Sequence, residues 1–297
     1  MKLLPEFGEI RKIAETGKYQ VLPVSCEMLS DFTTPIEVMK ILKNVSTHCY
    51  LLESAQANEK WGRYTFLGYD PKLEITCKDG VMKAGNLTIR TENPSDYLRQ
   101  ILADYKSPRF SYLPSFTGGL VGYFSYEYLG YSEPAVRCEV EDAEQFKDVD
   151  VMLFDKVIAF DHVKQKLILI VNMPLSDVEV GYNKAVVEIK QMAELLHHGQ
   201  KKEEPCGKMT GEVTPYFNRE EYCSMVEQAK HSIREGDIFQ IVLSNSLSAP
   251  FEGSLFQTYR VLRTINPSPY MFYISGTDVE VAGASPETLV KLEDGVL

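Results

Sequence analysis

The stretch from residue 64 to residue 91 constrains the fold of this chain more than any other. Four short runs rich in β-branched, aromatic and aliphatic residues follow one another closely here, and the turn pairs Asp79-Gly80 and Gly85-Asn86 separate the later ones. Such short turns join antiparallel neighbours, whereas parallel strands need a long crossover. The stretch therefore predicts an antiparallel meander with strands at 64–69, 73–77, 81–84 and 87–91.

The rest of the chain alternates clusters of strands with helices. Thr34-Pro35 and Asn93-Pro94 are helix starts, because each places a capping residue before a proline at the first helical position. Asn218 can cap a helix that stops at Gly236. Hairpins outnumber β-α-β units, which favours an α+β fold: an antiparallel β-sandwich with peripheral helices. Further strands are predicted at 49–52, 118–125, 151–171 (a hairpin around 161–166), 239–247, 270–275, 279–282 and 289–293, and further helices at 178–197, 255–265 and from Ser285 onward.

The final residues have the pattern of an unfinished sheet. Asp294-Gly295 is a strong two-residue hairpin signal, yet only Val296 and Leu297 follow it. A hairpin needs a returning strand. We therefore expect that the 297 residues are part of a longer protein.

The balance of charge limits the partners of the chain. Its 42 acidic and 31 basic residues give a net charge of −11, which argues against a nucleic-acid partner because phosphate backbones require clustered Lys and Arg. Small anionic substrates remain allowed, since a local basic site can hold them. We find neither a signal peptide nor an apolar run of membrane-spanning length, so we expect a cytoplasmic protein without a membrane partner.

Residues 198–213 are charged, glycine-bearing and aperiodic, which predicts a linker. The six cysteines form no C-x-x-C pair, and no histidine lies at a metal-finger spacing from any of them. We therefore expect buried or idle thiols and assign no metal ligand.

Two segments carry side chains suited to a ligand. The apolar strand at 49–52 delivers Glu53 and Ser54 at its end, where a carboxylate and a hydroxyl can bind an ammonium group. The alternative interpretation is a turn or a helix cap. Pro269 leaves its carbonyl free to accept, and the residues at 270–272 offer aromatic and thioether surface suited to an indole ring. The alternative interpretation of that segment is a core strand.

Six motifs in order give the chain a resemblance to component I of anthranilate synthase, a chorismate-utilising family. They are LLESA (51–55), GRYTFLG (62–68), GGLVGYFSYE (118–127), GDIFQIVLSN (236–245), NPSPYMFYI (266–274) and AGASPETLV (282–290). The resemblance is collinear and covers essentially the whole chain. It implies a sandwich of antiparallel sheets in which residues 1–165 form the N-terminal region, 166–213 a connecting helix and linker, and 214–297 the start of the chorismate-binding domain.

The resemblance also implies an activity. The family converts chorismate and ammonia to anthranilate and pyruvate in tryptophan biosynthesis, and a partner glutamine amidotransferase subunit supplies the ammonia. The complete enzyme requires Mg²⁺. A feedback site for tryptophan maps onto Ser54, Pro269, Tyr270 and Met271, with Glu53, Phe272 and Gly283 as neighbours.

The family's chorismate and Mg²⁺ residues are expected after Leu297, so the resemblance implies that the catalytic half is incomplete and that no catalytic or metal residue can be assigned here. We therefore expect this chain alone to be inactive. Two alternatives remain open, namely component I of aminodeoxychorismate synthase and a non-catalytic tryptophan-binding module. The PYM triplet favours the anthranilate branch.

Overall fold

The computed structural model describes residues 2–54, 62–136, 144–292 and 295–296. Its contacts divide the chain into two compact units, one formed by residues 1–203 and 259–297 and the other by residues 204–258. The first unit contains two antiparallel sheets and most of the helices. Each unit is described by itself.

An eight-stranded sheet forms the larger layer of the first unit, and every neighbouring pair in it is antiparallel. Strands from the two ends of the chain meet in this sheet, because β16 pairs with β3 and β17 pairs with β16. Its order is β1 (Leu3–Leu4), β2 (Val21–Leu29), β11 (Lys166–Pro174), β10 (Lys156–Asp161), β4 (Tyr64–Tyr69), β3 (Cys49–Glu53), β16 (Tyr270–Ser275) and β17 (Glu280–Ser285).

A five-stranded antiparallel sheet contains only the last three strands of the predicted meander. The predicted first strand, at 64–69, lies in the eight-stranded sheet between β3 and β10, so the expected four-stranded meander is wrong at that strand. A buried cluster joins the two sheets, with Tyr50 of the larger sheet packed among Val121, Met152 and Phe154 of the smaller one. The expected two-sheet antiparallel fold with helices around it is thus confirmed. The order of the smaller sheet is β7 (Leu87–Arg90), β6 (Val81–Ala84), β5 (Leu73–Lys78), β9 (Val149–Phe154) and β8 (Gly119–Phe124).

Local signals set the helix ends. Thr34 accepts a hydrogen bond from the backbone of Glu37 at the start of α2, and Asn218 forms a full capping box with Glu221 at the start of α6. Gly236 closes α6 with a φ of 83°, a left-handed conformation that favours glycine. The helices are α1 (Phe7–Glu15), α2 (Pro35–Val45), α3 (Pro94–Ala103), α4 (Leu129–Ser132), α5 (Val178–His198), α6 (Arg219–Glu235) and α7 (Leu255–Ile265), with 3₁₀ turns at Tyr126–Tyr128 and Pro134–Val136.

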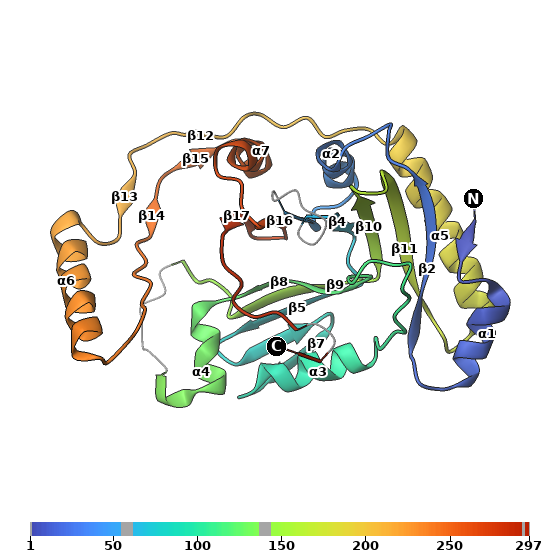
Figure 1. The fold of residues 1–297 in the computed structure, drawn as a ribbon, viewed down its shortest axis with the longest axis horizontal. Coiled ribbons are helices and arrows are strands. Elements are labelled where there is room, and N and C mark those ends of the chain that lie inside the picture. Colours follow the sequence, from blue (N-terminus) through green and yellow to red (C-terminus); the bar gives the residue numbers. More distant parts are fainter. Residues whose placement is uncertain (1, 55–61, 137–143, 293–294, 297) are drawn as a thin grey trace. The chain divides into compact units, whose positions relative to one another are not determined.

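The helices cover the outer faces of the two sheets. α2 and α5 pack on the eight-stranded sheet, and α1 packs on α5 (Figure 1). α3 lies beside the five-stranded sheet, where Leu98 joins a buried cluster with Ile75, Met82 and Val149 (Figure 1). The interior between the sheets and the layer beneath α2 are therefore separate environments.

The second unit consists of α6, the first residues of α7 and two short strand pairs. β12 (Lys208–Met209) pairs with β15 (Phe251–Glu252), and β13 (Thr214–Pro215) pairs with β14 (Leu247–Ser248). No residue of α6 is buried. This unit thus has little core of its own among its described residues.

Three further expectations from the sequence were wrong. The run at 239–247 forms a strand only at Leu247, because a strand requires a paired neighbour and the rest of the run pairs with no described strand. Phe239, at the start of this run, is 99% exposed. No helix begins at Ser285, since its pairing with Tyr270 keeps the backbone extended. The run at 289–292 is not a strand. Residue 293 and the Asp294 half of the predicted turn lie outside the described residues.

The two compact units also differ from the expected domains 1–165, 166–213 and 214–297. β11 begins at Lys166 and lies between β2 and β10, so the expected first boundary cuts a continuous sheet. β16 and β17 return to the first unit by pairing beside β3. Sheet pairing between distant segments therefore outweighs their order along the chain.

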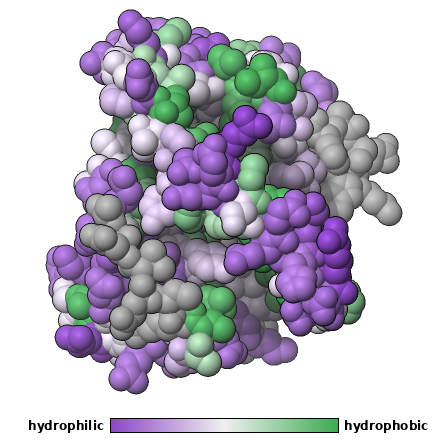
Figure 2. All heavy atoms as spheres, turned by 90° about the vertical axis from the view of Figure 1, so that its left-hand side faces the viewer, coloured by the Kyte–Doolittle hydropathy of each residue, from purple (hydrophilic) through white to green (hydrophobic). Residues whose placement is uncertain are grey.

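The surface and the thiols are consistent with the composition. Hydrophilic residues cover most of the face in Figure 2, and apolar residues lie between them in separate groups. Cys26, Cys49 and Cys77 are buried and free, Cys206 and Cys223 are exposed and free, and Cys138 lies outside the described residues. Within the described ranges, no helix combines the length and apolarity needed to cross a membrane.

Candidate binding site at the ends of β3 and β16

Strand pairing brings the predicted ligand residues together from distant parts of the sequence. Met271 of β16 lies opposite Glu53 of β3, and Phe272 lies opposite Gly283 of β17. Ser54 follows β3 directly, and Pro269 precedes β16 directly. The motifs at 53–54, 269–272 and 283 thus meet on three adjacent strands.

Strand alternation divides these residues between the two faces of the sheet. Glu53 and Met271 share one face, on which α7 contributes Tyr259. Phe272 and Gly283 lie on the other face, together with the side of β3 and β16 that packs against the five-stranded sheet. Alternation puts Tyr270 on the same face as Phe272, since the two are separated by one residue. The register therefore does not place all seven side chains in one pocket.

Gly283 and Phe272 form the best-defined contact on the inner face. A Cβ atom added to Gly283 would lie 2.3 Å from Cζ of the Phe272 ring. Only glycine leaves room for the aromatic ring in this position. Phe272 therefore occupies the space beside Gly283, one of the residues to which the resemblance maps the tryptophan site.

On the helix-covered face, the carboxylate of Glu53 is bound within the protein. Arg263 of α7 donates from Nε to Oε1 at 2.5 Å and from Nη2 to Oε2 at 2.7 Å, and the Tyr259 hydroxyl donates to Oε1 at 2.5 Å. The Glu53 side chain is 6% exposed, and that of Arg263 is 33% exposed. A ligand ammonium would have to share Glu53 with these two donors or displace one of them.

The pKa values of Tyr259 and His162, both close to Glu53, are shifted from their usual values. Burial, followed by the charge of Glu53, raises the pKa of Tyr259, so this hydroxyl stays a donor. Burial lowers the pKa of His162, which lies within electrostatic range of Glu53 and Arg263, and its Nε2 is 2.7 Å from the hydroxyl of Thr65. The surroundings of Glu53 are thus a polar cluster in which Arg263 is the main cation.

The remaining predicted residues are partly accessible. Ser54, Pro269 and Tyr270 are half-buried at the strand ends, and the Tyr270 hydroxyl lies 2.5 Å from that of Thr288. Met271, by contrast, is 1% exposed. A ligand ring would reach the Met271 thioether only if the packing above it opened.

Arg263 and Tyr259 are functional candidates that the sequence analysis missed. They are four residues apart on α7, so they lie on the same helix face. That spacing was visible in the sequence. Their partner was not, because Glu53 lies 210 residues before Arg263.

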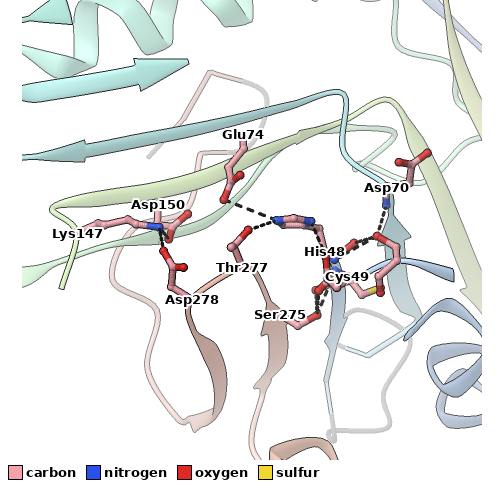
Figure 3. Close-up of polar contacts among 11 residues, drawn as sticks. His48, Cys49, Asp70, Glu74, Lys147, Asp150, Ser275, Thr277 and Asp278 are labelled. Carbon is pink, nitrogen blue, oxygen red and sulfur yellow. Dashed lines mark hydrogen bonds and ion pairs between the residues drawn. The ribbon is translucent and has the colours of Figure 1, made fainter. Parts of the chain in front are cut away.

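Polar contacts at the opposite end of the β16–β17 hairpin fix its turn (Figure 3). Nε2 of His48 lies 2.9 Å from the Thr277 hydroxyl and 3.7 Å from the Glu74 carboxylate of β5. Beside it, Lys147 forms an ion pair with Asp278 at 3.1 Å (Figure 3). The hairpin is therefore attached at its turn to the five-stranded sheet, while its other end carries the candidate site.

The described residues contain no group of three or more His, Cys, Asp or Glu side chains that could hold a metal ion. The site chemistry that the structure does show is a buried carboxylate with two donors, next to half-buried aromatic and hydroxyl groups. Such a combination can bind a zwitterionic or aromatic small molecule.

Known proteins resemble the chain over nearly its full length. Anthranilate synthase component 1 of Acetivibrio thermocellus is 34% identical, and the alignment covers 99% of this chain and 61% of that protein. The corresponding protein of Aquifex aeolicus is 33% identical, with the same coverage of 99% and 61%. The chain thus spans about three-fifths of the length of these curated relatives, 61% in both cases.

A solved structure and a protein-family model also match this chain. The crystal structure of anthranilate synthase component I from Streptococcus pneumoniae TIGR4 is similar with a TM-score of 0.66 and 30% identity, covering 81% of this chain and 53% of that one. The family model of chorismate-binding enzymes matches residues 47–297, a range that includes every residue of the candidate site. This chain therefore belongs to the family of chorismate-binding enzymes.

Proposed function

We propose that this chain is part of an anthranilate synthase component I, which converts chorismate and ammonia to anthranilate and pyruvate, and that it carries a feedback site for tryptophan. The names of the relatives support the first statement. The observation that supports the second is the strand register that brings Glu53 next to Met271 and Phe272 next to Gly283. Because the register divides these residues between two faces, the ligand would bind at the strand ends, next to Ser54, Pro269 and Tyr270.

In this proposal, the half-buried groups make first contact with tryptophan. The Ser54 hydroxyl accepts from the ammonium, the Pro269 carbonyl accepts a further hydrogen bond, and the Tyr270 and Phe272 rings contact the indole. Glu53 attracts the ammonium, although Arg263 already neutralises much of its charge. Met271 packs beneath the site.

Further parts of the proposal concern the complete enzyme. A glutamine amidotransferase subunit supplies ammonia, Mg²⁺ assists at the chorismate site, and the enzyme is cytoplasmic. The described residues do not fit a Mg²⁺ site, since no cluster of potential metal ligands lies among them. We therefore assign no reaction step to this chain through the metal.

Calorimetry with L-tryptophan tests the regulatory site. We expect saturable binding to the 297-residue chain, and we expect Ser54→Phe to weaken it at least about tenfold because a ring replaces the hydroxyl. Met271→Thr should also weaken binding, since it removes the thioether beneath the site. Met209→Thr is the matched control, because Met209 is 60% exposed and lies in the other unit. Unchanged affinity in both site variants would remove these residues from the site.

A separate measurement tests turnover. Anthranilate fluorescence is recorded with chorismate, ammonium and Mg²⁺, and we expect no product from the 297-residue chain alone. If this chain alone formed anthranilate in the presence of Mg²⁺, the proposal that the catalytic residues lie outside it would be contradicted. Tryptophan binding without turnover agrees with the proposal for this chain, whereas turnover by a longer protein containing it would exclude a purely regulatory module.

A further inference from the structure

A groove on the first unit lies away from the site described above. It has a volume of about 350 Å³ and is formed between α3 and the outer face of β5, β6 and β7. This volume is at the lower end of the range for small-molecule sites, about 300–1,000 Å³. The groove is large enough for one small ligand.

One wall of the groove is apolar and belongs to a single sheet face. Met82 and Ala84 alternate along β6, and Ile89 lies opposite Met82 on β7. Ala84 is the smallest of the side chains in this wall, so it creates much of the space. A larger residue at this position would fill the groove from the sheet side.

The opposite wall is a stripe along α3 that changes character toward the end of the helix. Tyr97, Gln100, Ile101 and Asp104 all line the groove, and their spacing of three and four residues places them on one helix face. Tyr97 and Ile101 pack against the core cluster beneath the sheet face. Gln100 and Asp104 are exposed, so the groove combines an apolar interior with a polar mouth.

The mouth of the groove is negative. Asp104 is the C-cap of α3, and no basic residue lies in the last turn of this helix. The carboxylate therefore adds to the negative end of the helix dipole, where a cation is normally favoured. Among the described residues, no ion pair involves Asp104. Close to the same helix end, the Lys72 ammonium lies 5.3 Å from the ring centre of Tyr105, so the protein already places a cation in this area.

We propose that this groove binds a small amphipathic amine, with its apolar body between Tyr97 and the β6 wall and its ammonium group at Asp104. The apolar walls favour an aromatic or aliphatic body. The Asp104 carboxylate, which forms no ion pair among the described residues, favours a cation over an anion at the helix end. This inference does not depend on the chorismate or tryptophan assignments.

The probe is 2-phenylethylamine, and 3-phenylpropanoate is its counterpart with a similar body and the opposite charge. Both are titrated into the 297-residue chain by calorimetry, and methyl NMR of Met82 and Ala84 locates the bound molecule. We expect saturable binding of the amine below about 10 mM, shifts of both methyl signals and at least fivefold weaker binding of the acid.

Three variants complete the experiment. Asp104→Asn removes the charge and is expected to weaken amine binding about fivefold, whereas Asp96→Asn makes the same change at the other end of α3, where Asp96 pairs with Arg99, and is expected to leave it unchanged. Ala84→Phe is expected to abolish binding, and circular dichroism reports whether this variant folds. The proposal is overturned if the amine shows no saturable binding, if the acid binds as well as the amine, or if Asp104→Asn and Asp96→Asn bind alike.

Discussion

Removal of the Arg263 guanidinium should destabilise the first unit through the charge that it leaves behind. Arg263→Ala deprives the Glu53 carboxylate of its bidentate partner while only 6% of that side chain is exposed. Breaking a buried ion pair by removing one partner costs about 3–5 kcal/mol. Because Arg263 is itself 33% exposed, water can partly replace it, so we expect a loss of about 2–4 kcal/mol in the free energy of unfolding.

Urea denaturation followed by circular dichroism measures this loss, and a double-mutant cycle isolates its cause. Glu53→Gln removes the unpaired charge, so the double variant Arg263→Ala/Glu53→Gln should be more stable than the sum of the single changes predicts, by about 1.5 kcal/mol. The matched control is Arg99→Ala, which breaks a pair whose side chains are 71% and 65% exposed and should cost less than about 0.5 kcal/mol. Equal losses for Arg263→Ala and Arg99→Ala, or a coupling energy near zero, would refute the reasoning.

Three further changes have effects of known direction. The Tyr50 hydroxyl is buried without a hydrogen-bond partner in the described structure, so Tyr50→Phe should raise the unfolding free energy by about 1 kcal/mol, and a lower melting temperature would contradict this. A Cβ on Gly122 would lie 2.0 Å from a carbonyl oxygen of β9, so Gly122→Ala should cost about 2–4 kcal/mol in urea denaturation, whereas Gly8→Ala in α1 meets nothing within 4 Å and should not destabilise. Burial raises the pKa of Asp161, but hydrogen bonds from Arg63 and two backbone amides lower it more, so the net shift is downward. The Asp161 carboxylate therefore stabilises the fold fully above about pH 4 and loses this effect as pH falls through its lower folded pKa. The stability difference between wild type and Asp161→Asn should shrink in that acidic range, and a constant difference from pH 7 to pH 2 would count against the ion pair.

Helix ends and tight turns could be predicted from the sequence, because neighbouring residues determine them. Thr34 and Asn218 cap their helices, Gly236 ends α6, and the turns at 79–80 and 85–86 join the strands of the meander. Each of these features is decided within a few residues. Their positions could therefore be predicted closely from the sequence.

Features that depend on distant partners were less predictable. The run at 239–247 has strand composition but lacks a described partner over most of its length, and Ser285 has a helix-start pattern but is held in β17 by Tyr270. The motifs of the candidate site lie on adjacent strands. Their division between two sheet faces, and the Arg263–Glu53 pair, follow from register and helix placement, which no short motif specifies.

The pairing of β16 with β3 also sets the order in which the protein can fold during its synthesis. Arg263 emerges 210 residues after Glu53, and the whole second unit is translated between them. At about 5–20 residues per second, this interval lasts about 10–40 s. Throughout it, the edge of β3 lacks the strand that later protects it, and the Glu53 carboxylate lacks its counterion. A nascent chain in this state presents an open sheet edge, which is the surface that ribosome-bound chaperones would need to cover until the β16–β17 hairpin is synthesised.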